Sequence, residues 1–401
     1  MSNLSHKIRL YPTKKQEEFF RKSCGCSRFV YNWALSTWKQ EYEAKLKPSG
    51  FGICNKIPEL KKTNSWLTEV SNSSLQRAVQ NLAASYQRFF KNKAKYPQFH
   101  KKGHKDSFYL TNKDVKIQGK KLKIPKVGSV NLAQELRLKG KIMSCTISRT
   151  ADQWLASISV ELSELPKQIK STNKTVGLDL GIKTAVVTSD GVSFKSPKPL
   201  SKYAKKLKRQ SQTLSRRVKG SNNRNKAKIK LSKTHAKIAR IRKDFIHKTT
   251  SKLIDENQVI CLEDLNVAGM KKNHKLARSL SDISFSEIRR QLEYKAALYG
   301  RQIKFVDRFF PSSKTCSKCG IVKESLSLKE RTFECICGFS IDRDINAAIN
   351  IRNFAVSRAG DKIPSRIGTG SPESGDKCRK PVRLCSEVSK SARQESLIYL
   401  R

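Results

Sequence analysis

The chain is 401 residues long and 37% hydrophobic, and its 83 lysines and arginines against 33 acidic residues give a formal net charge of +50. It has no apolar run of the about 18 residues that a transmembrane helix needs, and its first residues lack the apolar stretch of a secretory signal. We therefore expect a cytoplasmic protein with no membrane partner, whose charge attracts a polyanion such as nucleic acid. A ribosomal protein or a membrane-surface binder would share this composition.

A strand and then helices are predicted for the first part of the chain. Residues 5–11 predict a strand, and Pro12-Thr13 then opens a helix. Two helices are predicted over 13–23 and 27–47, with their aromatic residues in a helical core. A further amphipathic helix is predicted in SNSSLQRAVQNLAASYQRFFKNK, where serine and asparagine can cap the start and apolar residues recur three and four apart: Leu75, Val79, Leu82, Tyr86 and Phe89.

Short alternating runs such as SFYL, KLKIP and WLASISVEL follow between about 107 and 162, separated by turn glycines. This pattern of short alternating runs separated by turns predicts a small β-barrel. The strand at 5–11 would join it, which leaves the helices of 13–95 as an insertion. Residues 163–174 are expected to be a linker.

The second half opens with TVGLDLGIKTAVVTSDGVSFK, where an apolar run places Asp179 in a strand and a turn at Asp190-Gly191 predicts a β-meander. Residues 201–250 hold 18 lysines and arginines against one acidic residue, with leucines and isoleucines at helical spacing on either side of GSNN. They predict a basic helical hairpin. Its charge exceeds what solubility needs, which favours a phosphate-binding face over a merely solvated one.

NQVICLEDL predicts a second buried strand that ends at Glu263-Asp264, and QIKFVDRFF predicts a third. Between them a helix is predicted near 284–299, ended by Gly300. A closing helix, DINAAINIRNFAV, begins near Asp344, and the residues beyond 355 have few apolar side chains and are expected to be disordered.

Three acidic residues stand at ends or in apolar parts of these elements: Asp179, Glu263 and Asp344. Each has an ordinary explanation by itself, since a helix start favours aspartate and strand-end acids are common. A carboxylate in an apolar strand is nevertheless costly unless it is paired or bound to metal. Together the three indicate hard ligands for two Mg²⁺ ions about 4 Å apart, which is the arrangement of an RNase H-like nuclease.

Four of the eleven cysteines form two arms, Cys316-x-x-Cys319 and Cys335-x-Cys337, with 15 residues between them. In a reducing compartment such thiols stay free or hold a metal, and a disulfide is the alternative.

Several stretches resemble the TnpB family of insertion sequences, relatives of type V CRISPR effectors: GLDLGIKT, TLSRRVKGS, KDFIHK, LEDLNVAGM, QLEYKAALYG, FFPSSKTCSKCG and DRDINAAINI. The resemblance runs from RLYP to NIRNF and implies an RNA-guided DNA endonuclease with a RuvC nuclease domain. Its catalytic, magnesium-binding triad would be Asp179, Glu263 and Asp344. The family's last acid stands directly before x-Asn-Ala-Ala, which selects Asp344 over the nearby Asp342. In the same way, Asp264 is a neighbouring acid of Glu263 that is not assigned to the triad.

The same resemblance implies that Cys316, Cys319, Cys335 and Cys337 hold one structural zinc ion in a ribbon that interrupts the nuclease domain. A closed site of four thiolates leaves no position for a reacting water. The second arm is one residue shorter than the first, which predicts strain or weaker zinc binding there.

The resemblance further implies a guide RNA, a double-stranded DNA target with its displaced single strand, and one protein copy per guide. Base pairing would read the target while the protein reads a short adjacent duplex motif. We nominate Gln76 and Thr111 as readers of that motif, and Arg216, Arg217 and Lys219 as phosphate contacts. A DNA transposase and a guide-dependent repressor that does not cut remain the alternatives. Repressor relatives lack one or more of the acids.

The expected fold is therefore α+β and multidomain, a β-barrel with a helical insertion (the recognition lobe) followed by an RNase H-like RuvC domain carrying a zinc ribbon. The expected divisions are a first barrel strand (1–12), the helical recognition insertion (13–100), the barrel or wedge domain (101–165), the first part of the nuclease domain (166–310) with the basic hairpin (201–250), the zinc ribbon (311–340), the closing nuclease helix (341–355) and a disordered tail (356–401).

Overall fold

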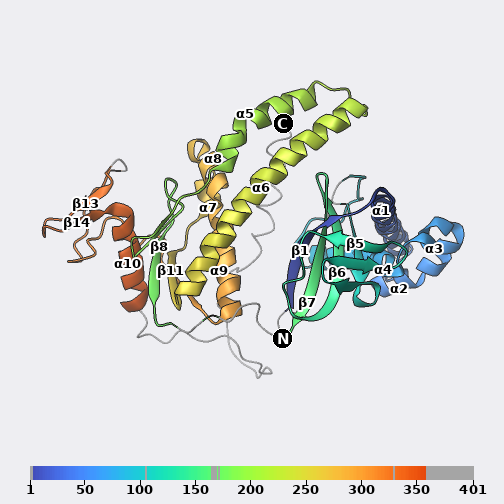
Figure 1. Cartoon of the computed structure of the whole chain (residues 1–401), viewed down its shortest axis with the longest axis horizontal. Coiled ribbons are helices and arrows are strands. Elements are labelled where there is room, and N and C mark those ends of the chain that lie inside the picture. Colours follow the sequence, from blue (N-terminus) through green and yellow to red (C-terminus); the bar gives the residue numbers. More distant parts are fainter. Residues whose placement is uncertain (1–2, 104–105, 164–168, 170–171, 328–329, 358–401) are drawn as a thin grey trace. The chain divides into compact units, whose positions relative to one another are not determined.

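The computed structural model describes residues 3–103, 106–163, 169, 172–327 and 330–357 (Figure 1). Among them, no helix combines the length and the apolar character needed to cross a bilayer. Most of the predicted linker at 163–174 and nearly all of the predicted tail lie outside the described residues. The described residues separate into two compact units, one made of 12–131 with 144–148, the other of 3–11, 132–143 and the described part of 149–357.

Seven strands of the N-terminal half form one sheet in the order β2-β6-β7-β1-β5-β4-β3. The first strand pairs antiparallel with β7, from Asn3 opposite Glu161 to Leu10 opposite Trp154, so it joins this sheet as predicted. Every second side chain of β7 is buried, as a strand with one face on a core requires. The strand bounds are β1 (Asn3–Tyr11), β2 (Ser107–Thr111), β3 (Lys116–Gln118), β4 (Lys121–Ile124), β5 (Gly128–Leu132), β6 (Gly140–Thr150) and β7 (Gln153–Leu162).

The two helices predicted over 13–23 and 27–47 are a single helix, α1 (Lys14–Glu43), and that prediction was wrong. A glycine inside a helix costs only about 1 kcal/mol, and the buried stripe runs unbroken past Gly25 from Phe20 to Leu35. Thr13 starts the helix with a capping box to Gln16.

The other predicted helix of this region is confirmed as α4, and its apolar face packs with that of α1 in one core. Helix α4 spans Asn72–Phe90, and the remaining elements are short: α2 (Gly50–Asn55), α3 (Ile57–Thr63), η1 (Ser65–Glu69) and, after β2, η2 (Asn112–Asp114).

The C-terminal half is built on a five-stranded sheet of order β10-β9-β8-β11-β12. Strand β11 pairs parallel with both β8 and β12, while β9 and β10 turn back antiparallel, which confirms the predicted meander. The strands are β8 (Thr175–Asp179), β9 (Val186–Thr188), β10 (Ser193–Phe194), β11 (Val259–Glu263) and β12 (Gln302–Val306).

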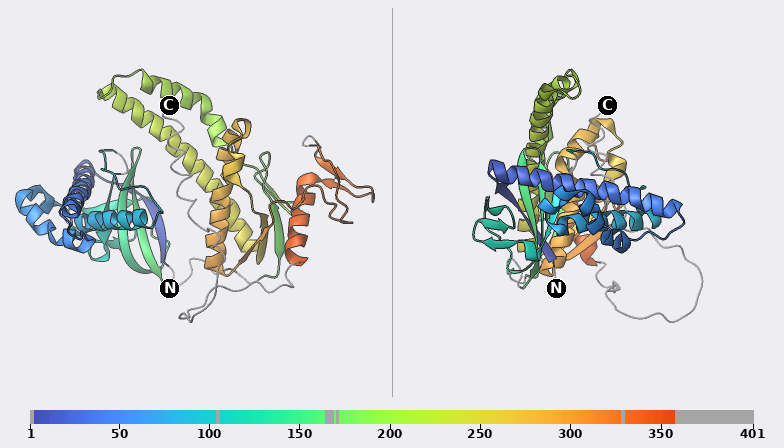
Figure 2. Two further views of the ribbon diagram at one scale, coloured as in Figure 1. Left: turned by 180° about the vertical axis from the view of Figure 1, so that it is seen from behind. Right: turned by 90° about the vertical axis from the view of Figure 1, so that its right-hand side faces the viewer.

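Helices cover both faces of this sheet, so the centres of β8 and β11 are fully buried. On one face, α6 and α9 form the main core with the sheet. On the other, α10 packs Ile351 and Ala355 against Cys261 and Val306 (Figures 1 and 2). The helices are α6 (Asn222–Glu256), α7 (Val267–Met270), α8 (His274–Ile283), α9 (Phe285–Tyr299), which ends at the predicted Gly300 with φ +65°, and α10 (Arg343–Ser357).

The predicted basic hairpin is confirmed as α5 (Pro199–Ser215) and the long α6, which lie side by side (Figure 1). Leu207 and Ile238 form a small core between them. The buried carboxylate of Asp282 accepts hydrogen bonds from the backbone amides of Leu200 and Ser201, at 2.8 and 3.0 Å, and so fixes the start of α5.

Candidate nuclease centre and cysteine cluster

Two of the three predicted acids lie at the same end of adjacent parallel strands. Leu178 of β8 stands opposite Leu262 of β11, so Asp179 and Glu263 follow at the same level, where both strands end. Carboxyl ends of parallel strands are where open α/β sheets place their functional side chains.

Helix α10 brings the third acid to this edge. It can lie directly on β8 because Gly177 has no side chain, and a Cβ there would overlap the carbonyl oxygen of Ala348. The first turn of α10, which carries Asp344, therefore reaches the end of β8. The Asp344 carboxylate lies close enough to repel the ionised form of Asp179.

The carboxylates at this edge of the sheet repel one another, and a bound cation would stabilise their ionised forms. Burial, followed by the charges of Glu263 and Asp344, raises the pKa of Asp179 to about 7, although Arg343 opposes the shift. Burial also raises the pKa of Glu263, with a hydrogen bond from Ser312 acting against it. Three carboxylates are the hard oxygen donors that Mg²⁺ prefers. The donor set therefore fits magnesium, whose positive charge would offset both the burial and the mutual repulsion.

The neighbouring acids are engaged elsewhere. Asp264 pairs with Arg289 at 2.5 Å and with Arg308 at 3.0 Å, and the hydrogen bond from Arg289 lowers the pKa of its carboxyl. Asp342 accepts hydrogen bonds from the backbone amides of Asp344 and Ile345, at 2.9 and 3.2 Å, and so caps α10. Both carboxylates are thus bound to partners within the fold.

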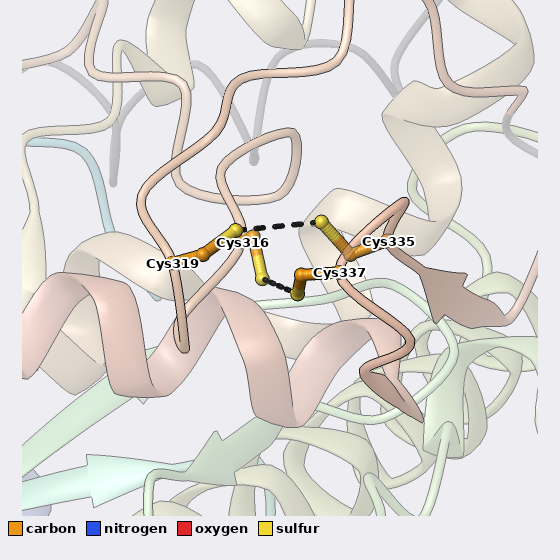
Figure 3. Close-up of side chains that lie close together, drawn as sticks. All are labelled: Cys316, Cys319, Cys335 and Cys337. Atoms are coloured by element: carbon orange, nitrogen blue, oxygen red, sulfur yellow. Dashed lines mark hydrogen bonds between the residues drawn. The ribbon is translucent and has the colours of Figure 1, made fainter.

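The four cysteines of the two arms converge on one point (Figure 3). Their sulfurs all lie within 4.8 Å of one another, with Cys316 3.8 Å from Cys337 and Cys319 3.5 Å from Cys335. A disulfide bond measures about 2.05 Å, so none of the described cysteines is paired. Four sulfurs about 2.3 Å from a tetrahedral zinc ion lie roughly 3.8 Å apart, so the cluster fits zinc.

Turns after each arm explain how the short second arm reaches the cluster. Gly320 and Gly338 both have positive φ, +79° and +77°, which glycine adopts without strain. The amide of Gly338 donates to the carbonyl of Cys335 at 3.0 Å, and the strands β13 (Thr332–Glu334) and β14 (Ser340–Asp342) pair on either side.

The carboxylates of Asp179, Glu263 and Asp344 are less tightly grouped: within the described chain, the acids form no metal-ligand group as tight as that of the four cysteines. Two ions about 4 Å apart would span a wider ligand set than one ion does.

The other nominated residues lie apart from the acidic edge. Gln76 is exposed on α4, and Thr111 ends β2 with its hydroxyl donating to Asp114 at 2.8 Å. The same Asp114 carboxylate accepts from Ser71 and Ser73 at the start of α4, at 3.1 and 2.6 Å. The structure therefore ties Thr111 to the helix that carries Gln76, through an aspartate that no sequence pattern singled out.

Arg216, Arg217 and Lys219 are exposed where α5 passes into α6. Arg224 holds this loop by donating to the carbonyls of Leu214 and Arg217, at 2.9 and 2.6 Å. These hydrogen bonds fix the backbone of the loop that joins α5 to α6, on which the three basic side chains are exposed.

A mixed sheet with acids at the ends of two adjacent parallel strands and on the helix that covers them, followed by a four-cysteine ribbon, defines an RNase H-like protein of the RuvC type. Comparison with known proteins agrees over most of the chain. Residues 157–274 match a family described as "Probable transposase", and residues 285–351 match "Cas12f1-like, TNB domain". Residues 1–47 match "Helix-turn-helix domain". In the described part of that range, however, the structure has strand β1 followed by the single continuous helix α1, and not two helices joined by a turn.

Two curated relatives extend over nearly the whole chain. A "Putative RNA-guided DNA endonuclease" of Streptomyces pristinaespiralis is 35% identical, covering 95% of this chain and 97% of the relative. "Putative RNA-guided DNA endonuclease InsQ" of Escherichia coli (strain K12) is 32% identical, covering 90% and 94%. The chain belongs to this family, the TnpB family. A Cas12f1 chain, solved by cryo-EM in a complex with sgRNA and target DNA, shares the fold with a TM-score of 0.51 at 14% identity, covering 88% of this chain and 99% of that one.

Proposed function

We propose that this protein is an RNA-guided DNA endonuclease that hydrolyses phosphodiester bonds with Mg²⁺ held by Asp179, Glu263 and Asp344. One observation carries the proposal: Asp179 ends a buried strand beside Glu263 and Asp344, and desolvation, followed by the charges of these two carboxylates, raises its pKa to about 7. The names of the two long relatives, both RNA-guided DNA endonucleases, support the substrate class.

The chain's own residues prepare the site in three ways. Asp342 fixes the first turn of α10 and so orients Asp344. Arg289 and Arg308 engage the carboxylate of Asp264, so Glu263 is the acid of this pair that we assign to the metal. When bound, Mg²⁺ would activate the attacking water and stabilise the leaving oxygen of the phosphodiester.

The four thiolates would hold a structural zinc ion, since all four positions of a tetrahedral site would be filled by protein. Guide RNA and target DNA would bind through the basic surface, with Arg216, Arg217 and Lys219 as phosphate contacts. Gln76 and Thr111 would read the motif beside the target, from the α4 start that Asp114 links to β2.

The test has two parts. RNA that copurifies with the protein is sequenced, and the purified complex is then given Mg²⁺ and a plasmid matched to the recovered guide. We expect one discrete guide RNA and cleavage by the wild type, and we expect Asp179→Ala to bind the target without cutting it. Full cleavage by Asp179→Ala would remove that residue from the triad. A protein without a discrete guide that joins DNA strands would be a transposase instead, and a guided protein that binds without cutting would be a repressor.

A further inference from the structure

Ser312, which lies in the family-resembling stretch FFPSSKTCSKCG, makes a direct contact with the centre. It lies between β12 and Cys316, is 6% exposed, and its Oγ donates a hydrogen bond to Oε1 of Glu263 at 2.5 Å. A hydroxyl that donates to a carboxylate stabilises the ionised form and holds the carboxylate in one orientation. Held in this orientation, the Glu263 carboxylate offers its remaining lone pairs to a cation.

Helix α10 holds Ser312 in place. Asn350 donates through its side-chain amide to the carbonyl oxygens of Ser312 and Thr315, at 2.8 and 2.6 Å. Asn346, one turn earlier, donates to the same Thr315 carbonyl at 2.7 Å and accepts from the amide of Ser317 at 3.0 Å. Both asparagine side chains are buried, so these bonds are costly to break.

These bonds join three parts of the centre. Asp344 stands in the first turn of α10, Asn346 and Asn350 follow on the same helix, and the segment that they bind leads directly into Cys316 of the cysteine cluster. The cysteine loop is therefore connected through Ser312 to Glu263, and through α10 to Asp344.

We propose that Ser312 is a positioning residue that orients Glu263 for metal binding, and that Asn346 and Asn350 hold it there. The inference rests on the proposed function, because it assigns Glu263 as a metal ligand. It also gives the cysteine cluster a role in the geometry of the nuclease centre, although the cluster takes no part in the chemistry.

The test measures metal binding separately from cleavage. Mn²⁺ serves as the probe, and its binding to the zinc-loaded, RNA-free full chain is measured by electron paramagnetic resonance, with Glu263→Gln as the reference for a lost ligand. We expect Ser312→Ala to weaken Mn²⁺ binding about 10- to 100-fold, the usual effect of removing a residue that orients a metal ligand. Ser312→Thr, which keeps the hydroxyl, should bind Mn²⁺ as the wild type does.

In the guide-loaded complex, Ser312→Ala should raise the Mg²⁺ concentration for half-maximal cleavage by a similar factor, with the maximal rate recovered at saturating Mg²⁺. Ser313→Ala, next to it in the same segment, is the matched control and should change neither quantity. Should Ser312→Ala fail to fold, Ser312→Val against Ser312→Thr gives the same comparison, since those side chains have the same shape and differ in the hydroxyl.

Equal Mn²⁺ binding by wild type and Ser312→Ala overturns the inference. So does weaker binding accompanied by loss of zinc, because Ser312 would then support the fold of the cysteine loop and not Glu263. A wild type that binds Mn²⁺ in a Ser312-dependent manner but cuts no guide-matched DNA would contradict the proposed function alone and support the positioning role.

Discussion

The raised pKa of Asp179 has a consequence for stability that can be measured without any nucleic acid. A shift from 3.8 to about 7 means that the folded protein binds a proton that the unfolded chain has already released. At 1.36 kcal/mol per pKa unit, the metal-free protein should lose about 4 kcal/mol of unfolding free energy from this group as the pH rises from about 4 to about 7. Asp179→Asn removes the titrating group, so its stability advantage over wild type should grow by about that amount across the window.

The assay is denaturant unfolding of zinc-loaded protein in Mg²⁺-free buffer at a series of pH values. Hydrogen exchange in β8 and β11 is then measured at the same pH values as a local readout. Adding Mg²⁺ should stabilise the wild type more at pH 8 than at pH 5, because the ligand must be ionised, and should do little for Asp179→Asn. Asp264→Asn is the control of opposite sign. Its carboxyl has a lowered pKa, so it contributes stability above the unfolded pKa that is lost on acidification. A difference between Asp179→Asn and wild type that is the same at every pH would refute the reasoning.

Three further outcomes are expected. Asp344→Ala should abolish cleavage of a guide-matched plasmid while target binding persists, and Asp342→Ala should be milder, since it removes a helix cap worth about 1 kcal/mol; an inactive Asp342→Ala beside an active Asp344→Ala would contradict the assignment. Cys316→Ser should lower zinc content, increase protease sensitivity at 316–338 and reduce cleavage indirectly, and active protein without zinc by elemental analysis would exclude a zinc site. Charge reversal in the α5–α6 loop should weaken RNA binding and reduce the slope of log K against log salt by about 2 to 3, whereas an unchanged slope would indicate a solvated face; the residues reversed are Arg216, Arg217 and Lys219.

Local patterns predicted most elements correctly where a strong periodicity or a turn residue was present. The meander at β8–β10, the basic hairpin and the glycine that ends α9 are examples. The prediction failed at α1, where two helices were expected over 13–23 and 27–47 and the structure has one. The buried stripe of the helix continues on both sides of Gly25, from Phe20 to Leu35, and its part beyond Gly25 packs with residues of α4, far along the chain.

The charge, the types of most elements, the spacing of the cysteines and the candidate ligands can all be derived from the amino-acid sequence. How those residues are used depends on contacts between distant parts of the chain. Asp264 is bound by arginines 25 and 44 residues away, and Glu263 receives its hydrogen bond from a serine 49 residues away. Such contacts depend on the register of parallel strands and on how closely α10 approaches β8 at Gly177. The local sequence predicts neither the strand register nor this close approach, because the side chains involved meet only after the strands have paired and the helix has packed on the sheet.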